Sequence, residues 1–181
     1  MRDDLIAGAR PSFSRRPTRD GPVAVVDVGS NSVRLVVFEG ASRAPAYLFN
    51  EKVACGLGSG LAETGRLAPE SVERALRVLA RFAAVAERMR VAALDAVATA
   101  AVRDAQDGPA FVAQVEAETG LRLRVVDGAE EARLSAVGAL VGEPMAEGAV
   151  ADMGGASMEL AEIAGGRVGA RLSLSLGPQW L

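Results

Sequence analysis

The chain alternates between short apolar runs and longer stretches whose apolar residues recur at helical spacing. The short runs predict strands of a buried sheet, and they lie at Val23–Val26, Val33–Phe38, Ala44–Ala54, Ala92–Ala98 and Leu121–Val126. The helical stretches predict three helices, namely Pro69–Met89, 108–119 and Asp127–Val141. The resulting order, βββ–α–β–α–β–α, indicates a mixed sheet with helices on its faces and right-handed crossovers.

The pattern starts again after Gly148, with three more apolar runs at Ala149–Met153, Met158–Ile163 and Val168–Leu176. We therefore expect a first domain over 21–145 and the beginning of a second over 146–181. Because no helical stretch follows these strands, we expect one face and one edge of their sheet to stay open. An open face and edge favour pairing with another chain, so a homodimer is a candidate assembly.

Polar turns interrupt two of these strand pairs in the same way. Asp27 ends the first strand, and the small residues Gly29, Ser30, Asn31 and Ser32 follow it. Asp152 similarly precedes Gly154, Gly155, Ala156 and Ser157. Glycine tolerates positive φ, and small residues let backbone N–H groups converge on an anion. A carboxylate beside such a nest suits a phosphate with Mg²⁺, although an ordinary hairpin with a polar turn is the alternative.

Composition narrows the chemistry. The 181 residues are 50% hydrophobic and carry a net charge of −3, which argues against broad attraction to nucleic acid or membrane. The chain has no histidine, so a general base has to be Asp or Glu, or less plausibly Tyr47 or Cys55. Cys55, the single cysteine, is consistent with a reducing compartment and is expected to be buried and inert, and we expect a cytoplasmic protein. The arginine-rich residues 1–20 lack the apolar stretch of a secretory signal and predict a disordered tail.

Five motifs, in order, resemble the exopolyphosphatase/guanosine pentaphosphate phosphatase (Ppx/GppA) family of the actin/sugar-kinase/Hsp70 superfamily. They are DVGSNS (Asp27–Ser32), GLGSGLAETGRLAPE (Gly56–Glu70), ATAAVRDAQDG (Ala98–Gly108), DGAEEARL (Asp127–Leu134) and DMGGASMEL (Asp152–Leu160). The resemblance implies an α/β fold: an actin-like ATPase (ribonuclease H-like) first domain followed by the first three strands of a truncated second domain. It also implies that Gly56–Gly65 lies near the active-site cleft, whereas the residues alone allow a flexible connector.

The resemblance further implies hydrolysis of a terminal phosphoanhydride, with polyphosphate or guanosine pentaphosphate as substrate. Glu131 is the implied base. Mg²⁺, with Mn²⁺ as a substitute, is assigned to Asp27, Asp152 and Glu159. The implied phosphate-binding residues are the two turns and an arginine, namely Gly29, Ser30, Asn31, Ser32, Gly154, Gly155, Ala156, Ser157 and Arg103.

Several residues keep a second interpretation. Asp127 and Glu130 match a capping box, and Glu131 in the same first turn would complement the helix dipole without any catalytic role. Arg103 could pair on the surface with Asp104 or Asp107. Ala156 stands where the family has a third glycine, which predicts a slightly impaired fit to phosphate.

Two other functions remain open on the sequence. One is an ATP phosphotransferase of the actin or sugar-kinase type, against which the DGAEEARL and ATAAVRDAQDG motifs argue. The other is a non-catalytic phosphate-binding or interaction fragment, because the resemblance to the family implies that half of the cleft wall is absent from these 181 residues.

Overall fold

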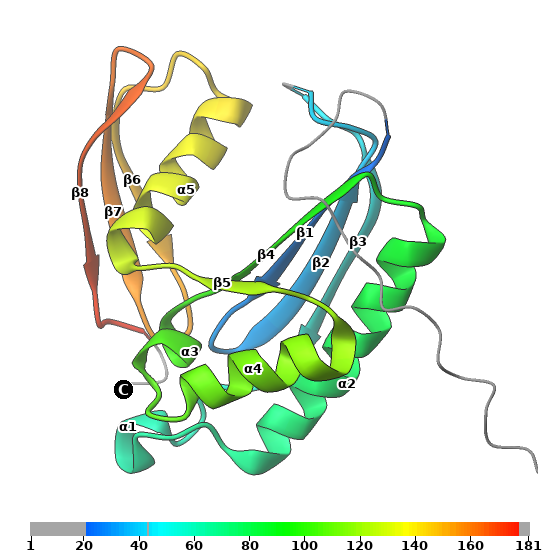
Figure 1. Ribbon diagram of the computed structural model, residues 1–181. Helices are drawn as coiled ribbons and strands as arrows, with labels where there is room; N and C mark the ends of the chain where they lie inside the picture. The colour runs from blue at the N-terminus through cyan, green and yellow to red at the C-terminus, as the bar shows by residue number, and fades with distance from the viewer. Residues whose placement is uncertain (1–20, 43, 178–181) are drawn as a thin grey trace, which may run out of the picture.

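The computed structural model describes residues 21–42 and 44–177, so the predicted disordered tail lies outside the described residues. These residues form two separate sheets joined through one helix (Figure 1). The first sheet has the order β3-β2-β1-β4-β5, with strands β1 (Val23–Val28), β2 (Ser32–Phe38), β3 (Tyr47–Ala54), β4 (Ala93–Ala98) and β5 (Leu123–Val125). The second has the order β6-β7-β8, with strands β6 (Gly148–Met153), β7 (Met158–Ala164) and β8 (Arg167–Leu174).

The first sheet is mixed, as the order of elements predicts. β1, β2 and β3 pair antiparallel, whereas β1, β4 and β5 run parallel. Residues alternate between its faces, so Val26 and Val28 are fully buried while Asp27 projects from the opposite face. Helices α2 (Pro69–Arg88) and α4 (Gly108–Thr119) pack on the buried face and complete the main hydrophobic core. The carboxyl ends of the parallel strands meet at one edge, where open α/β sheets bind ligands.

Two short helices are not among the three helices that the sequence predicts. α1 (Leu61–Thr64) lies between Gly60 and Gly65, both left-handed, and α3 (Ala100–Asp104) follows Thr99 directly. Alanine-rich segments favour helix, which explains α3. Asp107 stands at the N-cap position of α4, as its place before the helix suggests, but its side chain does not cap the helix, because the carboxylate accepts instead from the N–H of Leu67 at 3.1 Å.

Helix α5 (Gly128–Gly142) covers one face of the second sheet, although it precedes those strands in the chain. Ala132 and Ala136 on the helix pack against Ala161 and Ile163 of β7 in a small second core. The helix therefore lies within the predicted first domain yet packs on the sheet of the second. The opposite face of this sheet bears exposed apolar residues, among them Met153, Leu172 and Leu174. That this face meets a second copy of the chain stays a prediction.

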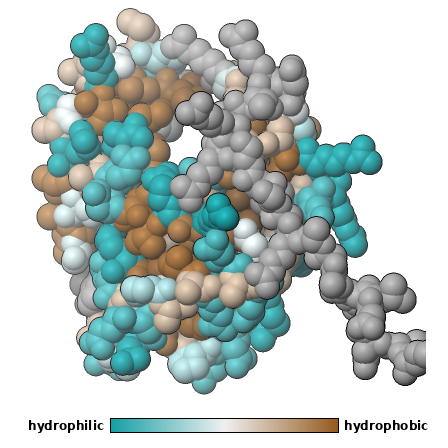
Figure 2. Space-filling model, viewed as in Figure 1, coloured by the Kyte–Doolittle hydropathy of each residue, from teal (hydrophilic) through white to brown (hydrophobic). Residues whose placement is uncertain are grey.

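Helix α5 also carries exposed apolar side chains away from the small core, namely Leu134, Val137 and Val141. Figure 2 shows apolar surface over the upper part of this helix. No helix among residues 21–42 and 44–177 is both long and apolar enough to cross a membrane.

Candidate active site

The two polar turns have the same backbone geometry. The N–H of Gly29 donates to the carbonyl of Ser32 at 2.9 Å, and the N–H of Gly154 donates to the carbonyl of Ser157 at 2.8 Å. Gly29 does not use the positive φ that its glycine allows. The close carbonyl favours glycine at 29 instead, since a Cβ there would lie 3.3 Å from the Ser32 oxygen, which is a tight contact. At Gly154 the corresponding distance to the Ser157 oxygen is 3.5 Å, an ordinary contact.

The glycine-rich segment after β3 supports the first turn, which rules out the interpretation that it is only a connector. The N–H groups of Cys55 and Gly56 both donate to the carbonyl of Asn31 at 2.9 Å, and Gly58 donates to the carbonyl of Ser30 at 2.8 Å. In a planar trans peptide the C=O and the following N–H point in opposite directions. The N–H groups of Asn31 and Ser32 therefore point away from this segment. Cys55 itself is fully buried, as predicted, and burial raises the pKa of its thiol, as expected for an unreactive cysteine.

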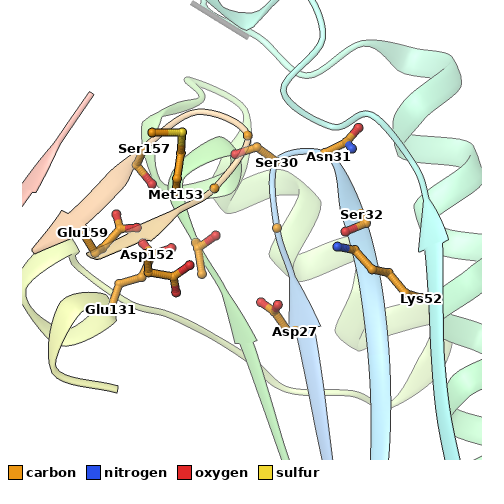
Figure 3. A pocket seen from close by; sticks show the side chains of 14 residues that line it. Asp27, Ser30, Asn31, Ser32, Lys52, Glu131, Asp152, Met153, Ser157 and Glu159 are labelled. Carbon is orange, nitrogen blue, oxygen red and sulfur yellow. The ribbon is translucent and has the colours of Figure 1, made fainter. Parts of the chain in front are cut away.

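Both turns line one cavity of about 410 Å³ between the two sheets (Figure 3). This volume lies within the range of small-ligand sites, roughly 300–1,000 Å³. Most of the predicted site residues line it together, namely Asp27, Gly29, Ser30, Asn31, Ser32, Glu131, Asp152, Gly154, Gly155, Ser157 and Glu159. Three further lining residues, Lys52, Thr99 and Met153, were not predicted. Only Lys52 carried a signal in the sequence, as the chain's single lysine.

Glu131 enters this cavity from the first turn of α5, where the chain leaves β5. Its side chain is only 18% exposed, and its Oε2 accepts from Nη1 of Arg103 at 3.1 Å. Burial and the nearby negative charge of Glu159 raise the pKa of Glu131 from 4.5 to about 7, with a smaller raising effect from Asp27 and a lowering one from Arg103. A carboxylate with this pKa exchanges protons readily at neutral pH, as a general base must.

Arg103 and Ala156 are not among the residues that line the cavity. The Arg103 guanidinium donates to Glu131, to the carbonyl of Val126 at 3.3 Å and, through Nε, to Asp104 at 3.0 Å. It thus combines the predicted surface pair with Asp104 and a contact to the site carboxylate. Ala156 is buried, with 5% of its surface exposed.

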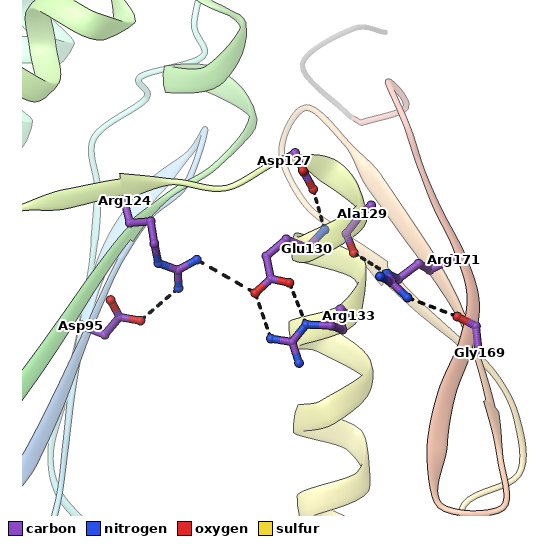
Figure 4. A network of polar contacts seen from close by, with 8 residues as sticks. All are labelled: Asp95, Arg124, Asp127, Ala129, Glu130, Arg133, Gly169 and Arg171. Atoms are coloured by element: carbon purple, nitrogen blue, oxygen red, sulfur yellow. Dashed lines mark hydrogen bonds and ion pairs between the residues drawn. The ribbon is translucent and has the colours of Figure 1, made fainter. Parts of the chain in front are cut away.

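Glu130, the neighbour of Glu131 in the chain, does not line the cavity and contacts a different set of residues (Figure 4). Its N–H donates to the Asp127 carboxylate at 2.7 Å, which confirms Asp127 as the cap of α5. The Glu130 carboxylate, however, does not complete the capping box. It accepts two hydrogen bonds from Arg133, at 2.7 and 2.8 Å, and lies 4.0 Å from Arg124 on β5. These arginine contacts, with the Arg133 hydrogen bonds foremost, lower the pKa of Glu130. The contact with Arg124 is the one of them that reaches the first sheet.

Carboxylates dominate the cavity. Burial raises the pKa of Asp27, with a smaller raising effect from Asp152 and opposing effects from Arg34 and Lys52. Asp152 accepts from Ser135 Oγ at 2.6 Å and Glu159 accepts from Ser173 Oγ at 2.8 Å, so both side chains are oriented by serines. The described residues contain no group of three or more His, Cys, Asp or Glu arranged to hold a metal ion. A Mg²⁺ ion nevertheless fits this donor set, because it usually takes one or two carboxylates and fills its other positions with water and phosphate oxygens.

Known proteins share the fold of this chain. The Ppx/GppA phosphatase family model matches residues 35–181. Exopolyphosphatase 2 of Mycobacterium tuberculosis is 39% identical over 155 residues, which cover 76% of this chain and 47% of that protein. An exopolyphosphatase from Cytophaga hutchinsonii superposes with a TM-score of 0.81 at 29% identity, over 87% of this chain and 51% of that one. The Aquifex aeolicus member of the Ppx/GppA family gives 0.77 at 30% identity, over 87% and 52%.

The fold is that of the actin-like ATPases. Within that class, the chain belongs to the Ppx/GppA phosphatase family. It spans about half the length of the relatives it matches.

Proposed function

We propose that this protein is a phosphohydrolase that removes the terminal phosphate of polyphosphate. The observation that carries the proposal is the position of Glu131: its carboxylate lines the same cavity as both phosphate-type turns, and its pKa there is about 7. The names of the relatives support polyphosphate as the substrate class. Guanosine pentaphosphate is a second substrate of the same chemistry, because it also ends in a phosphoanhydride.

Glu131 accepts a proton from the water that attacks the terminal phosphorus. The new P–O bond forms to that water as the phosphoanhydride P–O bond breaks, and the shortened chain leaves with the bonding electron pair. Arg103 holds the Glu131 carboxylate in place from outside the cavity and, with its charge, keeps part of the carboxylate ionised. The N–H groups of the turns at 29–32 and 154–157 bind phosphate oxygens, apart from those of Gly29 and Gly154, which donate within the turns. Preorganised donors of this kind stabilise developing charge.

Asp27, Asp152 and Glu159 would hold Mg²⁺, with Mn²⁺ as a substitute, one or two of them directly and the rest through water, since carboxylate oxygens suit these ions. When bound, such an ion neutralises phosphate charge and lets the polyanion approach a carboxylate-rich cavity. Asp27 and Asp152 lie close enough for the charge of Asp152 to raise the pKa of Asp27, as expected for two ligands of one ion.

Orthophosphate release tests the proposal. The protein is incubated with polyphosphate, guanosine pentaphosphate or ATP, each with Mg²⁺ and with a chelator. We expect Mg²⁺-dependent release from polyphosphate, and weaker Mg²⁺-linked phosphate binding by Asp152→Asn in calorimetry. Tight tripolyphosphate binding without release would identify a non-catalytic binding protein. Consumption of ATP only when a phosphate acceptor is supplied would identify a phosphotransferase.

A further inference from the structure

Lys52, on β3, brings a positive charge to a cavity that is otherwise lined by carboxylates. Of the described residues that line this cavity, Lys52 is the one with a cationic side chain, whereas Asp27, Glu131, Asp152 and Glu159 are acidic. We propose that Lys52 binds a phosphate group of the substrate other than the one beside Glu131. The residue would thereby make the cavity select chains of phosphate over orthophosphate, an inference that rests on the proposed function.

The strand register places Lys52 in the same cross-strand row as Asp27, the carboxylate beside the first turn. Asp27 on β1 pairs with Arg34 on β2, and Arg34 pairs with Lys52 on β3. Residues directly opposite in neighbouring strands share a face, so these three form one row across the open side of the sheet. Two strand spacings separate Asp27 from Lys52, roughly 10 Å between Cα atoms. A lysine side chain that leans along the row therefore has its ammonium group over the cavity, as Figure 3 shows.

The two cations of this row differ in what they already bind. Arg34 donates through Nε to the side-chain oxygen of Asn50 at 3.0 Å and does not line the cavity. Lys52 is exposed to the cavity, and within residues 21–42 and 44–177 no hydrogen bond or ion pair is formed by its side chain. An ammonium group without a protein partner is available to a ligand, and a compact, mobile point charge suits a phosphate oxygen.

The charges of the cavity are distributed unevenly from one side to the other. Figure 3 shows Glu131, Asp152 and Glu159 together on the side of the second sheet, Lys52 on the side of β3, and Asp27 between them. A phosphate chain whose terminal group lies beside Glu131 extends away from the acidic side if its next groups are to avoid those carboxylates. Lys52 lies in that direction. Orthophosphate has no second group to reach it, and this is the source of the proposed selectivity.

Calorimetry with tripolyphosphate and with orthophosphate, both with Mg²⁺, tests this role. Lys52→Gln removes the charge and leaves a polar side chain one bond shorter, Lys52→Arg keeps the charge, and Arg34→Gln removes the neighbouring charge that is outside the cavity. A lost charge-assisted contact predicts that Lys52→Gln weakens tripolyphosphate binding by about tenfold or more. We expect orthophosphate binding to change by less than about threefold in this variant, and Lys52→Arg to recover most of the tripolyphosphate affinity.

The Arg34→Gln variant shows whether Lys52 acts by contacting the phosphate or only through the electrostatic field of a nearby positive charge. Arg34 lowers the pKa of Asp27 more than Lys52 does, so a long-range field would make Arg34→Gln at least as harmful as Lys52→Gln. Equal losses in the two variants, or equal losses for the two ligands, would overturn the role of Lys52. Orthophosphate release by the wild-type protein, measured in parallel, separates the two proposals. If the wild-type protein releases orthophosphate but Lys52→Gln binds tripolyphosphate as tightly as wild type, only the role of Lys52 is contradicted. If Lys52→Gln loses tripolyphosphate affinity selectively but the wild-type protein releases no orthophosphate, only the proposed hydrolysis is contradicted.

Discussion

The two phosphate-type turns have the same hydrogen-bond geometry but very different support. The first lies between strands whose inward residues are fully buried, among them Val28 and Val33, and the glycine-rich segment donates three hydrogen bonds to it. The second follows β6, whose residues are mostly exposed. Its sheet rests on a small core of four buried residues, and Gly177 approaches the turn so closely that any side chain there would collide with the carbonyl of Gly155. The first turn is thus a fixed platform, and the second is the part of the site with more freedom to move.

The cross-strand partners differ as well. Asp27 faces Arg34 across the first hairpin, whereas Asp152 faces Glu159 across the second. An acidic pair is favourable at the second turn only when a cation joins it, since like charges directly opposite one another repel. The comparison therefore predicts that the first turn exists in its binding form without a ligand, and that the second depends on a metal ion and phosphate.

The largest expected effect concerns Glu131, the proposed general base in the cavity that both turns line. If both turns act on one phosphate, Glu131→Gln should lower kcat by a factor on the order of 10²–10⁴ with substrate binding nearly unchanged. Glu130→Gln is the matched control, because Glu130 has the same charge one residue earlier but contacts Arg133 outside the cavity. We expect its kcat to stay within about twofold of wild type. Steady-state orthophosphate release measures both, and the reverse pattern would exchange the two roles.

The next effect tests whether the two cores are independent. Ile163, at 2% exposure, belongs to the small core of the second sheet, and Leu35, fully buried, belongs to the main core. Truncation of a buried Leu or Ile to Ala costs about 2–5 kcal/mol. Ile163→Ala should speed amide hydrogen exchange in β6–β8 and leave β1 and β4 protected, whereas Leu35→Ala should speed exchange throughout the first sheet. Equal acceleration of both sheets by Ile163→Ala would show that the platform and the second turn unfold as one unit.

A smaller effect comes from the raised pKa of Glu131. In the folded chain Glu131 titrates at about 7, against 4.5 for an unperturbed glutamate. Between these values the folded state binds more protons than the unfolded state, so the free energy of unfolding falls as pH rises from 4.5 to 7. Without metal, Glu131→Gln should therefore be more stable than wild type above pH 7, by on the order of 1–3 kcal/mol, and nearly equal to it at pH 4.5. Urea unfolding in a chelator measures this, and a difference that does not change with pH would show that Glu131 has an ordinary pKa.

The sequence predicts most of the fold because apolar residues recur at clear strand or helix spacing in the elements that the main core buries completely. β1, β2 and α2 follow directly from runs and stripes that the main core buries. The predictions fail where local signals compete with long-range contacts. Glu130 satisfies the spacing of a capping box, but its carboxylate contacts two arginines instead: Arg133, three residues later in the helix, and Arg124 on β5. Lys52 has no motif around it, and only the pairing of β2 with β3 shows that it reaches the cavity.

The central claim is that the two turns bind one phosphate chain, and amide chemical shifts test it directly. The labelled protein is titrated with tripolyphosphate in Mg²⁺, and the N–H signals of 29–32 and 154–157 are followed together. The account predicts that both sets shift with a single dissociation constant, with the larger changes at 154–157, because the second turn has the weaker support. Shifts at 29–32 alone, or two different dissociation constants for the two turns, would contradict it.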